Sequence, residues 1–67
     1  MNKNEVIKAL RSKGFDVIDY LDTLIVHKMD RNKEVAISRN DILDALDHNI
    51  NFHQIRQIDS FTIVIVF

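Results

Sequence analysis

Two capped helical segments, each followed by two β-prone runs, limit the folds open to this 67-residue chain more than any other feature. Asn2 and Ser38 precede the two apolar stripes, and an acidic residue stands three positions after each cap, at Glu5 and Asp41. This spacing is the capping-box pattern, in which the cap and the acidic side chain each accept a hydrogen bond from the other's backbone N–H. The pattern predicts that a helix begins at each site.

The remaining elements follow from runs of β-branched and aromatic residues bounded by turn residues. Gly14 is expected to end the first helix, because glycine takes the left-handed C′ conformation most readily. The order αβββαββ predicts an α+β fold, a two-layer sandwich with two helices on one face of an antiparallel sheet of about five strands. The expected bounds are Lys3 to Lys13 and Ser38 to about Asn49 for the helices, and Phe15 to Tyr20, Leu24 to Met29, Glu34 to Ile37, Phe52 to Ile58 and Phe61 to Phe67 for the strands.

The two halves of the chain also resemble each other in sequence. Residues 4–10 align with residues 40–46 at a constant offset of 36. After a slip of one residue, Phe15 aligns with Phe52, Ile18 with Ile55 and Asp22-Thr23 with Asp59-Ser60. Two interpretations are open: a tandem αββ repeat with one extra strand between its copies, or two unrelated amphipathic helices that each precede a hairpin.

Length and composition favour a small cytoplasmic domain. Residues 1–67 are expected to form a single domain, because a chain of this length is near the lower limit for independent folding. Cysteine is absent, which excludes disulfides and thiolate metal ligands. The longest uninterrupted apolar run, Ile63 to Phe67, is too short to span a bilayer, and the N-terminus opens on a polar cap. A cytoplasmic location is the resulting expectation.

The C-terminal strand carries more apolar side chains than one buried face requires. Its odd-numbered residues are expected to face one way and Val64 and Val66 the other, whereas the open face of a one-sided sheet normally carries polar residues. Three explanations are open: a central strand half covered by loops, a homodimer interface formed by edge pairing or face packing, and a docking site for a different protein. The candidate partner-binding residues are Phe61, Ile63, Val64, Ile65, Val66 and Phe67.

Charged residues form two further candidate surfaces on the helices. The net charge of −1 lacks the basic excess that non-specific nucleic-acid binding usually needs. Four basic residues nevertheless gather on the first helix as candidate phosphate contacts: Lys3, Lys8, Arg11 and Lys13. Asp41, Asp44 and Asp47 recur every three residues as an acidic ridge on the second helix. That ridge fits a basic partner, pairing with Lys8 and Arg11 of the first helix, or simple solvation.

Catalytic, metal and cofactor sites are not expected. The three histidines, His27, His48 and His53, lack the spacing of a zinc site, although the last two flank one loop and could approach each other. Gly14 is the only glycine, so a glycine-rich phosphate loop is excluded. No serine stands in a pattern that predicts a nucleophile with a histidine base. The sequence therefore predicts a protein that is not an enzyme and needs no cofactor.

Residues 5–10 run into Lys13-Gly14-Phe15, and residues 34–37 lead into the second predicted helix. On these stretches the chain, from Asn4 to Asn49, resembles the HicA-type mRNA-interferase toxins. The resemblance implies an αβββα core like that of double-stranded-RNA-binding domains. The family's Gly-x-x-His or Gly-Ser-His is replaced by Leu21-Asp22-Thr23-Leu24, His27 falls several residues later, and the C-terminal hairpin is foreign to the family. The resemblance therefore implies a topology and no ribonuclease activity.

These observations lead to two functional hypotheses. The first is a small protein-binding module, acting as a homodimer, of the kind that phages and prophages use as inhibitors or regulators. It follows from the apolar C-terminal strand and from the unequal charge of the two helices. The second is a nucleic-acid-binding domain with a HicA-like core that lacks the catalytic histidine and uses the basic first helix. Salt-sensitive binding to generic DNA or RNA distinguishes the second hypothesis from the first.

Overall fold

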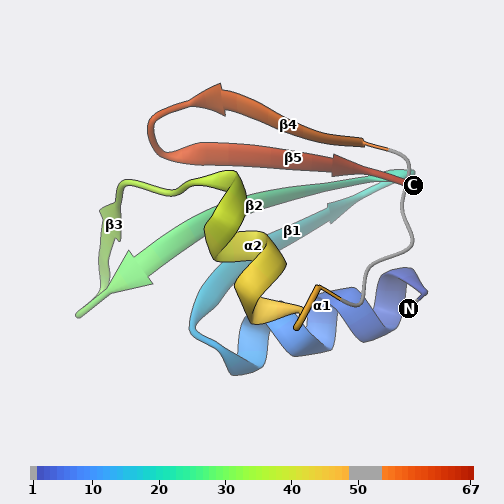
Figure 1. Cartoon of the computed structure of the whole chain (residues 1–67), viewed down its shortest axis with the longest axis horizontal. Coiled ribbons are helices and arrows are strands. Elements are labelled where there is room, and N and C mark those ends of the chain that lie inside the picture. Colours follow the sequence, from blue (N-terminus) through green and yellow to red (C-terminus); the bar gives the residue numbers. More distant parts are fainter. Residues whose placement is uncertain (1, 49–53) are drawn as a thin grey trace.

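A computed structural model describes residues 2–48 and 54–67 and confirms the expected element order αβββαββ (Figure 1). Asn2 caps the first helix and Ser38 caps the second, and both capping boxes are formed. Three residues used in the predictions lie outside the described residues: Asn49, the expected end of the second helix, Phe52, the expected start of the fourth strand, and His53, which was considered together with His48. The elements are α1 (Lys3–Ser12), β1 (Phe15–Tyr20), β2 (Thr23–Asp30), β3 (Lys33–Val35), α2 (Arg39–Ala45), β4 (Gln54–Asp59) and β5 (Thr62–Val66).

The five strands form one antiparallel sheet in the order β1-β2-β5-β4, with β3 paired to β2. Strand β2 is the longest, and one of its edges pairs with the whole length of β1. Its other edge pairs first with β5, over Thr23 to Val26, and then with β3, over Lys28 to Asp30. The C-terminal strand β5 is therefore an inner strand, with β2 on one side and β4 on the other. Both of its backbone edges are used, so the edge-pairing form of the homodimer hypothesis is wrong for this strand.

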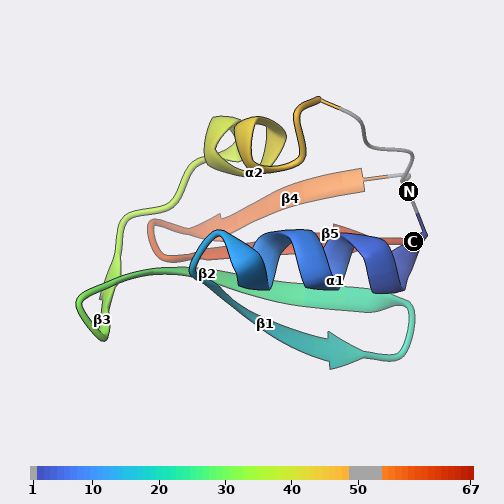
Figure 2. The ribbon, with the colours of Figure 1, turned by 90° about the horizontal axis from the view of Figure 1, so that it is seen from below.

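Both helices cover the same face of the sheet, α1 against β1 and α2 against β4. In Figure 1 they lie below the sheet, and Figure 2 shows α1 lengthwise in front of the strands. Alternate strand residues point to this face, as the period of two in a β-strand requires. The core between the two layers consists of Val6, Ile7, Leu10, Val17, Leu24, Val26, Ile37, Ile42, Leu46, Ile63 and Ile65. The predicted two-layer sandwich is confirmed.

The C-termini of the two helices differ. Helix α1 ends as expected, with Gly14 at a φ of 91°. Helix α2 ends at Ala45, so the expected end near Asn49 is wrong. The reason is a Schellman motif: the N–H of Asp47 donates to Asp44 O at 3.2 Å, and the N–H of His48 donates to Leu43 O at 2.8 Å. Asp47 occupies the left-handed C′ position, with a φ of 53°, where glycine is usual.

The topology is that of two αββ units joined by β3. Each helix leads into a hairpin with a two-residue turn, and the second strands of the two hairpins pair with each other at the centre of the sheet. The alignment of Ile18 with Ile55 is nevertheless wrong in register. Ile18 is exposed on one face of the sheet, whereas Ile55 packs against the core on the other. Structurally, Thr23 and Thr62 both open the strand that follows the turn.

Candidate protein-binding face

The sheet face that points away from the helices is the candidate site, here called the open face. Because Leu24 and Val26 point into the core, the intervening and flanking residues of β2 point to the open face. The same alternation selects one set of residues from each neighbouring strand. The open face consists of Asp16, Ile18 and Tyr20 of β1, Thr23, Ile25, His27 and Met29 of β2, Glu34 of β3, Gln54 and Arg56 of β4, and Thr62, Val64 and Val66 of β5. Asp59, which stands opposite Thr62 after the shift in the β4–β5 register, also belongs to it.

An apolar row crosses the middle of the open face. The register places Ile18 opposite Ile25 and Ile25 opposite Val64, so that three β-branched side chains stand side by side on adjacent strands. Ile18 is 46% exposed, and the other two are half-buried by their neighbours. Tyr20, which is 62% exposed, and the half-buried Val66 extend the row toward the β1–β2 turn. The described helices leave this row uncovered (Figure 1).

Three further exposed apolar side chains lie at the two hairpin turns. Leu21 is 75% exposed in the β1–β2 turn, and Phe61 is 46% exposed in the β4–β5 turn. Ile58 is 58% exposed at the irregularity in the pairing of β4 with β5. The two turns lie at opposite ends of the sheet (Figure 1). Apolar surface therefore continues from the middle row toward both ends of the molecule.

The structure divides the six apolar residues expected to bind a partner among three environments. Ile63 and Ile65 are fully buried beneath the helices, and Phe67 packs against the same core. Val64 and Val66 are half-buried on the open face. Phe61 precedes β5 and lies in the turn, so its expected place in the strand is wrong. Val64 and Val66 are therefore accessible on the open face and Phe61 at the turn, whereas the half-buried Phe67 lies on the side of the core.

One end of the open face is acidic. His27 lies there, with Glu34 Oε1 3.8 Å from its Nε2 and Asp16 as its cross-strand neighbour. Asp59 lies opposite Thr62 beside the β4–β5 turn, and His27 is one of the groups that lower the pKa of its carboxyl. The pKa of Asp59 is lowered, first because the backbone N–H of Phe61 donates to its carboxylate, at 2.8 Å from Oδ1, and further by hydrogen bonds from Thr62. The carboxylates of Asp16, Glu34 and Asp59 therefore lie at the same end of the sheet as His27.

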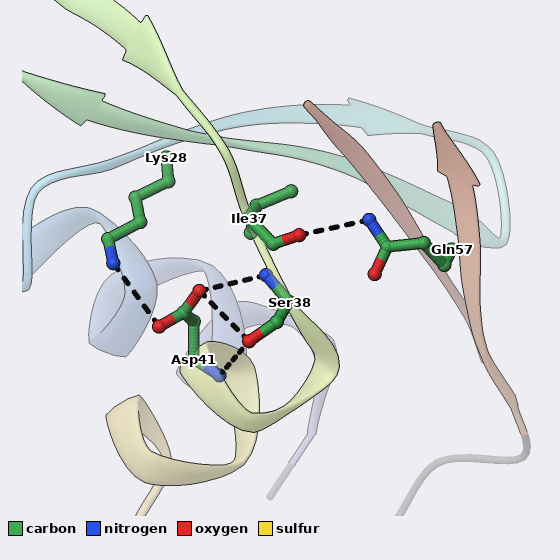
Figure 3. Close-up of polar contacts among 5 residues, drawn as sticks. All are labelled: Lys28, Ile37, Ser38, Asp41 and Gln57. Carbon is green, nitrogen blue, oxygen red and sulfur yellow. Dashed lines mark hydrogen bonds and ion pairs between the residues drawn. The ribbon is translucent and has the colours of Figure 1, made fainter. Parts of the chain in front are cut away.

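The acidic ridge expected on α2 is not continuous in the structure. Asp41 points inward, where Lys28 Nζ donates to Oδ1 at 3.2 Å and the backbone N–H of Ser38 donates to Oδ2 at 2.8 Å (Figure 3). Burial tends to raise the pKa of Asp41, but these hydrogen bonds and the Lys28 ammonium lower it overall. Asp44 is exposed and pairs with His48 at 3.4 Å, and Asp47 lies beyond the helix. The expected pairing of this ridge with Lys8 and Arg11 does not appear among the described ion pairs.

The polar contact beside Asp41 fixes the segment that enters α2. Gln57 Nε2 donates to Ile37 O at 3.0 Å (Figure 3). The backbone N–H of Ile37 donates to Ser60 O at 2.9 Å. Gln57 belongs to β4, so the segment between β3 and α2 is held against the β4–β5 hairpin. These residues lie on the helical side of the sheet and take no part in the open face.

Two of the four basic residues on α1 are engaged within the chain. Lys3 Nζ lies 2.9 Å from Asp19 Oδ1 and donates to Leu21 O at 2.8 Å. Arg11 Nη2 donates to Val17 O at 2.8 Å. Lys8 and Lys13 are exposed. Two of the four side chains on which the nucleic-acid hypothesis depends are therefore engaged within the chain, and the other two remain exposed.

Metal sites, pockets and membrane-spanning helices are absent from the described residues. No group of three His, Asp or Glu side chains that could hold a metal ion occurs within residues 2–48 and 54–67. The part of the chain that the structure describes contains no detectable pocket. Neither described helix has the length and apolar character needed to cross a membrane.

Comparison of the chain with protein-family models, with curated proteins and with solved structures gives no match. The resemblance to the HicA-type toxins therefore gains no support from a family match. Candidate functional residues come from the geometry of the open face.

Part of that face is visible in the sequence. The runs Val17-Ile18 and Leu24-Ile25-Val26 are apolar on both sides, which indicates a second apolar surface. The acidic end is not predicted by the sequence, because Asp16, Glu34 and Asp59 lie far apart along the chain. Only the register of β1 and β3 against β2, and of β4 against β5, brings them together. No pattern in the sequence predicts these strand registers.

Proposed function

We propose that this chain is a small non-enzymatic protein-binding module and that the open face of its sheet is the binding surface. The observation that carries the proposal is the row Ile18, Ile25 and Val64, which crosses the sheet on the face that neither helix covers. Such a face on a one-sided antiparallel sheet normally carries polar residues. Contiguous exposed apolar surface on a small domain marks an interaction site.

Strand geometry supports a surface that binds by face packing. The middle row of the open face is composed of β-branched side chains on paired strands, which hold their rotamers with little freedom to lose on binding. Tyr20 adds a large amphipathic side chain of the kind enriched at protein interfaces. A partner that covers the middle row excludes water from Ile18 and completes the burial of Ile25 and Val64.

The biological role within this proposal is that of a regulator or inhibitor that acts by occupying another protein, in the cytoplasm, of the type encoded by phages and prophages. The partner is either a second copy of the chain or a different protein. In both cases the open face is the contact, and the helical layer supports it from behind. Gln57, Asp41 and the core residues hold the sheet in place and do not meet the partner.

The experiment that tests the proposal compares two variants of the folded chain. Ile18→Thr retains a β-branched residue but removes apolar surface from the open face, and Lys8→Thr is the matched change on the helical side. Circular dichroism verifies that both remain folded. Sedimentation velocity measures self-association, and affinity capture from the native host cells identifies other partners.

We expect Ile18→Thr to weaken self-association or the capture of a specific partner, and Lys8→Thr to leave both unchanged. The proposal is wrong if the wild-type chain is monomeric and its captured proteins are the same for wild type and Ile18→Thr. It is also wrong if Lys8→Thr abolishes an interaction that Ile18→Thr preserves.

A further inference from the structure

We propose that the open face binds a cationic protein segment, one whose apolar side chains cover the middle row and whose Lys or Arg side chain meets the acidic end. This inference rests on the proposed function and adds the chemistry of the partner. Two features of one surface carry it: the uncovered apolar row, and the carboxylates placed beside it.

The charge of the open face is unevenly distributed. Asp16, Glu34 and Asp59 lie at the end that holds His27, where the Glu34 side chain is 54% exposed. Arg56 is the one basic residue of this face among the described strands, and it lies opposite Val64 in the middle row. Its Nε donates to Gln54 Oε1 at 3.0 Å, which draws it toward Gln54 and away from the acidic end. Three carboxylates therefore stand against one guanidinium on this face.

A second copy of the chain fits this charge pattern poorly. Two aligned sheets can stack face to face about a two-fold axis that runs either along or across their strands. An axis along the strands places the acidic end of one copy over the acidic end of the other. An axis across the strands, through the middle row, places Arg56 over Arg56 of the second copy. Both arrangements bring like charges together at a surface from which water is removed, which disfavours association.

A cationic segment avoids both conflicts. Its apolar residues bury the row formed by Ile18, Ile25 and Val64, and its basic side chain lies among the carboxylates beside His27. Carboxylates at the edge of an apolar patch give orientation and specificity more than affinity, so they fix which end of the partner lies over β3. The partner therefore has at least one Lys or Arg at one end of an apolar stripe.

The test uses two synthetic peptides of equal length, each with Leu at alternate positions, so that the Leu side chains form one stripe in an extended segment. The stripe ends on two adjacent charged residues, which are Lys in the Leu-Lys peptide and Glu in the Leu-Glu peptide. Each is titrated into the isotope-labelled full chain, and amide chemical shifts report both affinity and location. The variant Asp16→Asn/Glu34→Gln neutralises two carboxylates of the acidic end and leaves the Asp59 turn intact. The matched control Asp30→Asn/Asp44→Asn makes the same charge change away from the open face. Sedimentation velocity of the free chain runs in parallel.

We expect the Leu-Lys peptide to bind at least about tenfold more tightly than the Leu-Glu peptide, with shifts confined to residues of the open face. The preference falls severalfold in Asp16→Asn/Glu34→Gln and persists in the control variant. Equal binding of both peptides at the open face overturns the cationic partner and leaves the protein-binding function standing. A stable dimer whose open face excludes both peptides assigns the face to a second copy and also overturns the inference. Failure of both peptides to bind a monomeric chain overturns the inference and removes support from the proposed function.

Discussion

Replacing Asp47 by glycine should stabilise the protein, although Asp47 belongs to the acidic ridge expected to bind a partner. Asp47 holds a φ of 53° at the C′ position of α2, where its side chain crowds the backbone. Its carboxylate also lies at the negative end of the helix dipole. Both features oppose folding, and Asp47→Gly removes both.

The magnitude follows from three contributions. A left-handed conformation costs an L-residue about 1–2 kcal/mol, with Asp near the lower limit because its short side chain tolerates this region. Removing the charge at an exposed helix C-terminus contributes about 0.3–1 kcal/mol. Glycine lowers the free energy of unfolding by about 0.5–1 kcal/mol, because it gives the unfolded chain more conformational freedom. The expected net gain in the free energy of unfolding is about 1 kcal/mol, equivalent to a rise in Tm of about 4–8 °C for a domain of this size.

Urea denaturation followed by circular dichroism measures this gain, and two other variants separate its causes. Asp47→Asn removes the charge but keeps a side chain in the left-handed region, so it should gain less than Asp47→Gly. Gly14→Ala makes the opposite change at the C′ position of α1. A Cβ there meets no atom within 4 Å, so its expected loss of about 1 kcal/mol reports backbone strain alone. The reasoning is refuted if Asp47→Gly is no more stable than the wild type while Gly14→Ala is destabilised.

Three further predictions concern the core, the inward-pointing Asp41 and nucleic acid. Leu24→Ala should lower the free energy of unfolding by about 2–5 kcal/mol and leave the chain largely unfolded by circular dichroism, whereas Ile18→Ala should lower it by less than about 1 kcal/mol. Equal losses in the two variants would show that Leu24 is not in the core. Asp41→Asn should cost about 1 kcal/mol in urea titrations at neutral pH. Because the folded-state pKa of Asp41 is lowered, its contribution to the free energy of unfolding is present above the unfolded-state pKa near 3.8 and is lost as the pH falls through the folded-state pKa. The difference in stability between wild type and Asp41→Asn should therefore shrink as the pH falls through this range. The chain should show no salt-sensitive binding to generic DNA or RNA that depends on Lys8 and Lys13. Binding that falls steeply with salt and disappears in Lys8→Gln/Lys13→Gln would support the nucleic-acid hypothesis instead.

The helix starts and the element order could be predicted from the sequence because they depend on neighbouring residues. Asn2 and Ser38 cap helices through residues three positions away, and Gly14 ends α1 through its own conformational freedom. The end of α2 could not be predicted in the same way. Asp47 is an ordinary residue in a helical pattern, and only the hydrogen bonds in the structure show that it takes the position usually held by glycine.

The sheet order depends on contacts between distant parts of the chain, which explains why the binding surface was only partly predicted. The alternation in β5 correctly separated Ile63 and Ile65 from Val64 and Val66. It did not show whether β5 was an edge or an inner strand, because that depends on its pairing with β2. Once this pairing is known, the apolar row and the acidic end follow from the registers.

Site-specific photo-crosslinking in the native host cells tests most directly whether the open face is the binding surface. A benzophenone amino acid replaces Tyr20, which is 62% exposed beside the apolar row, and in a second variant it replaces Lys8 on the outer side of α1. A binding surface on the open face predicts a discrete crosslinked protein from the Tyr20 position and none of comparable yield from Lys8. Crosslinks to a defined protein from Lys8 alone, with Tyr20 silent in a folded and expressed chain, would contradict it.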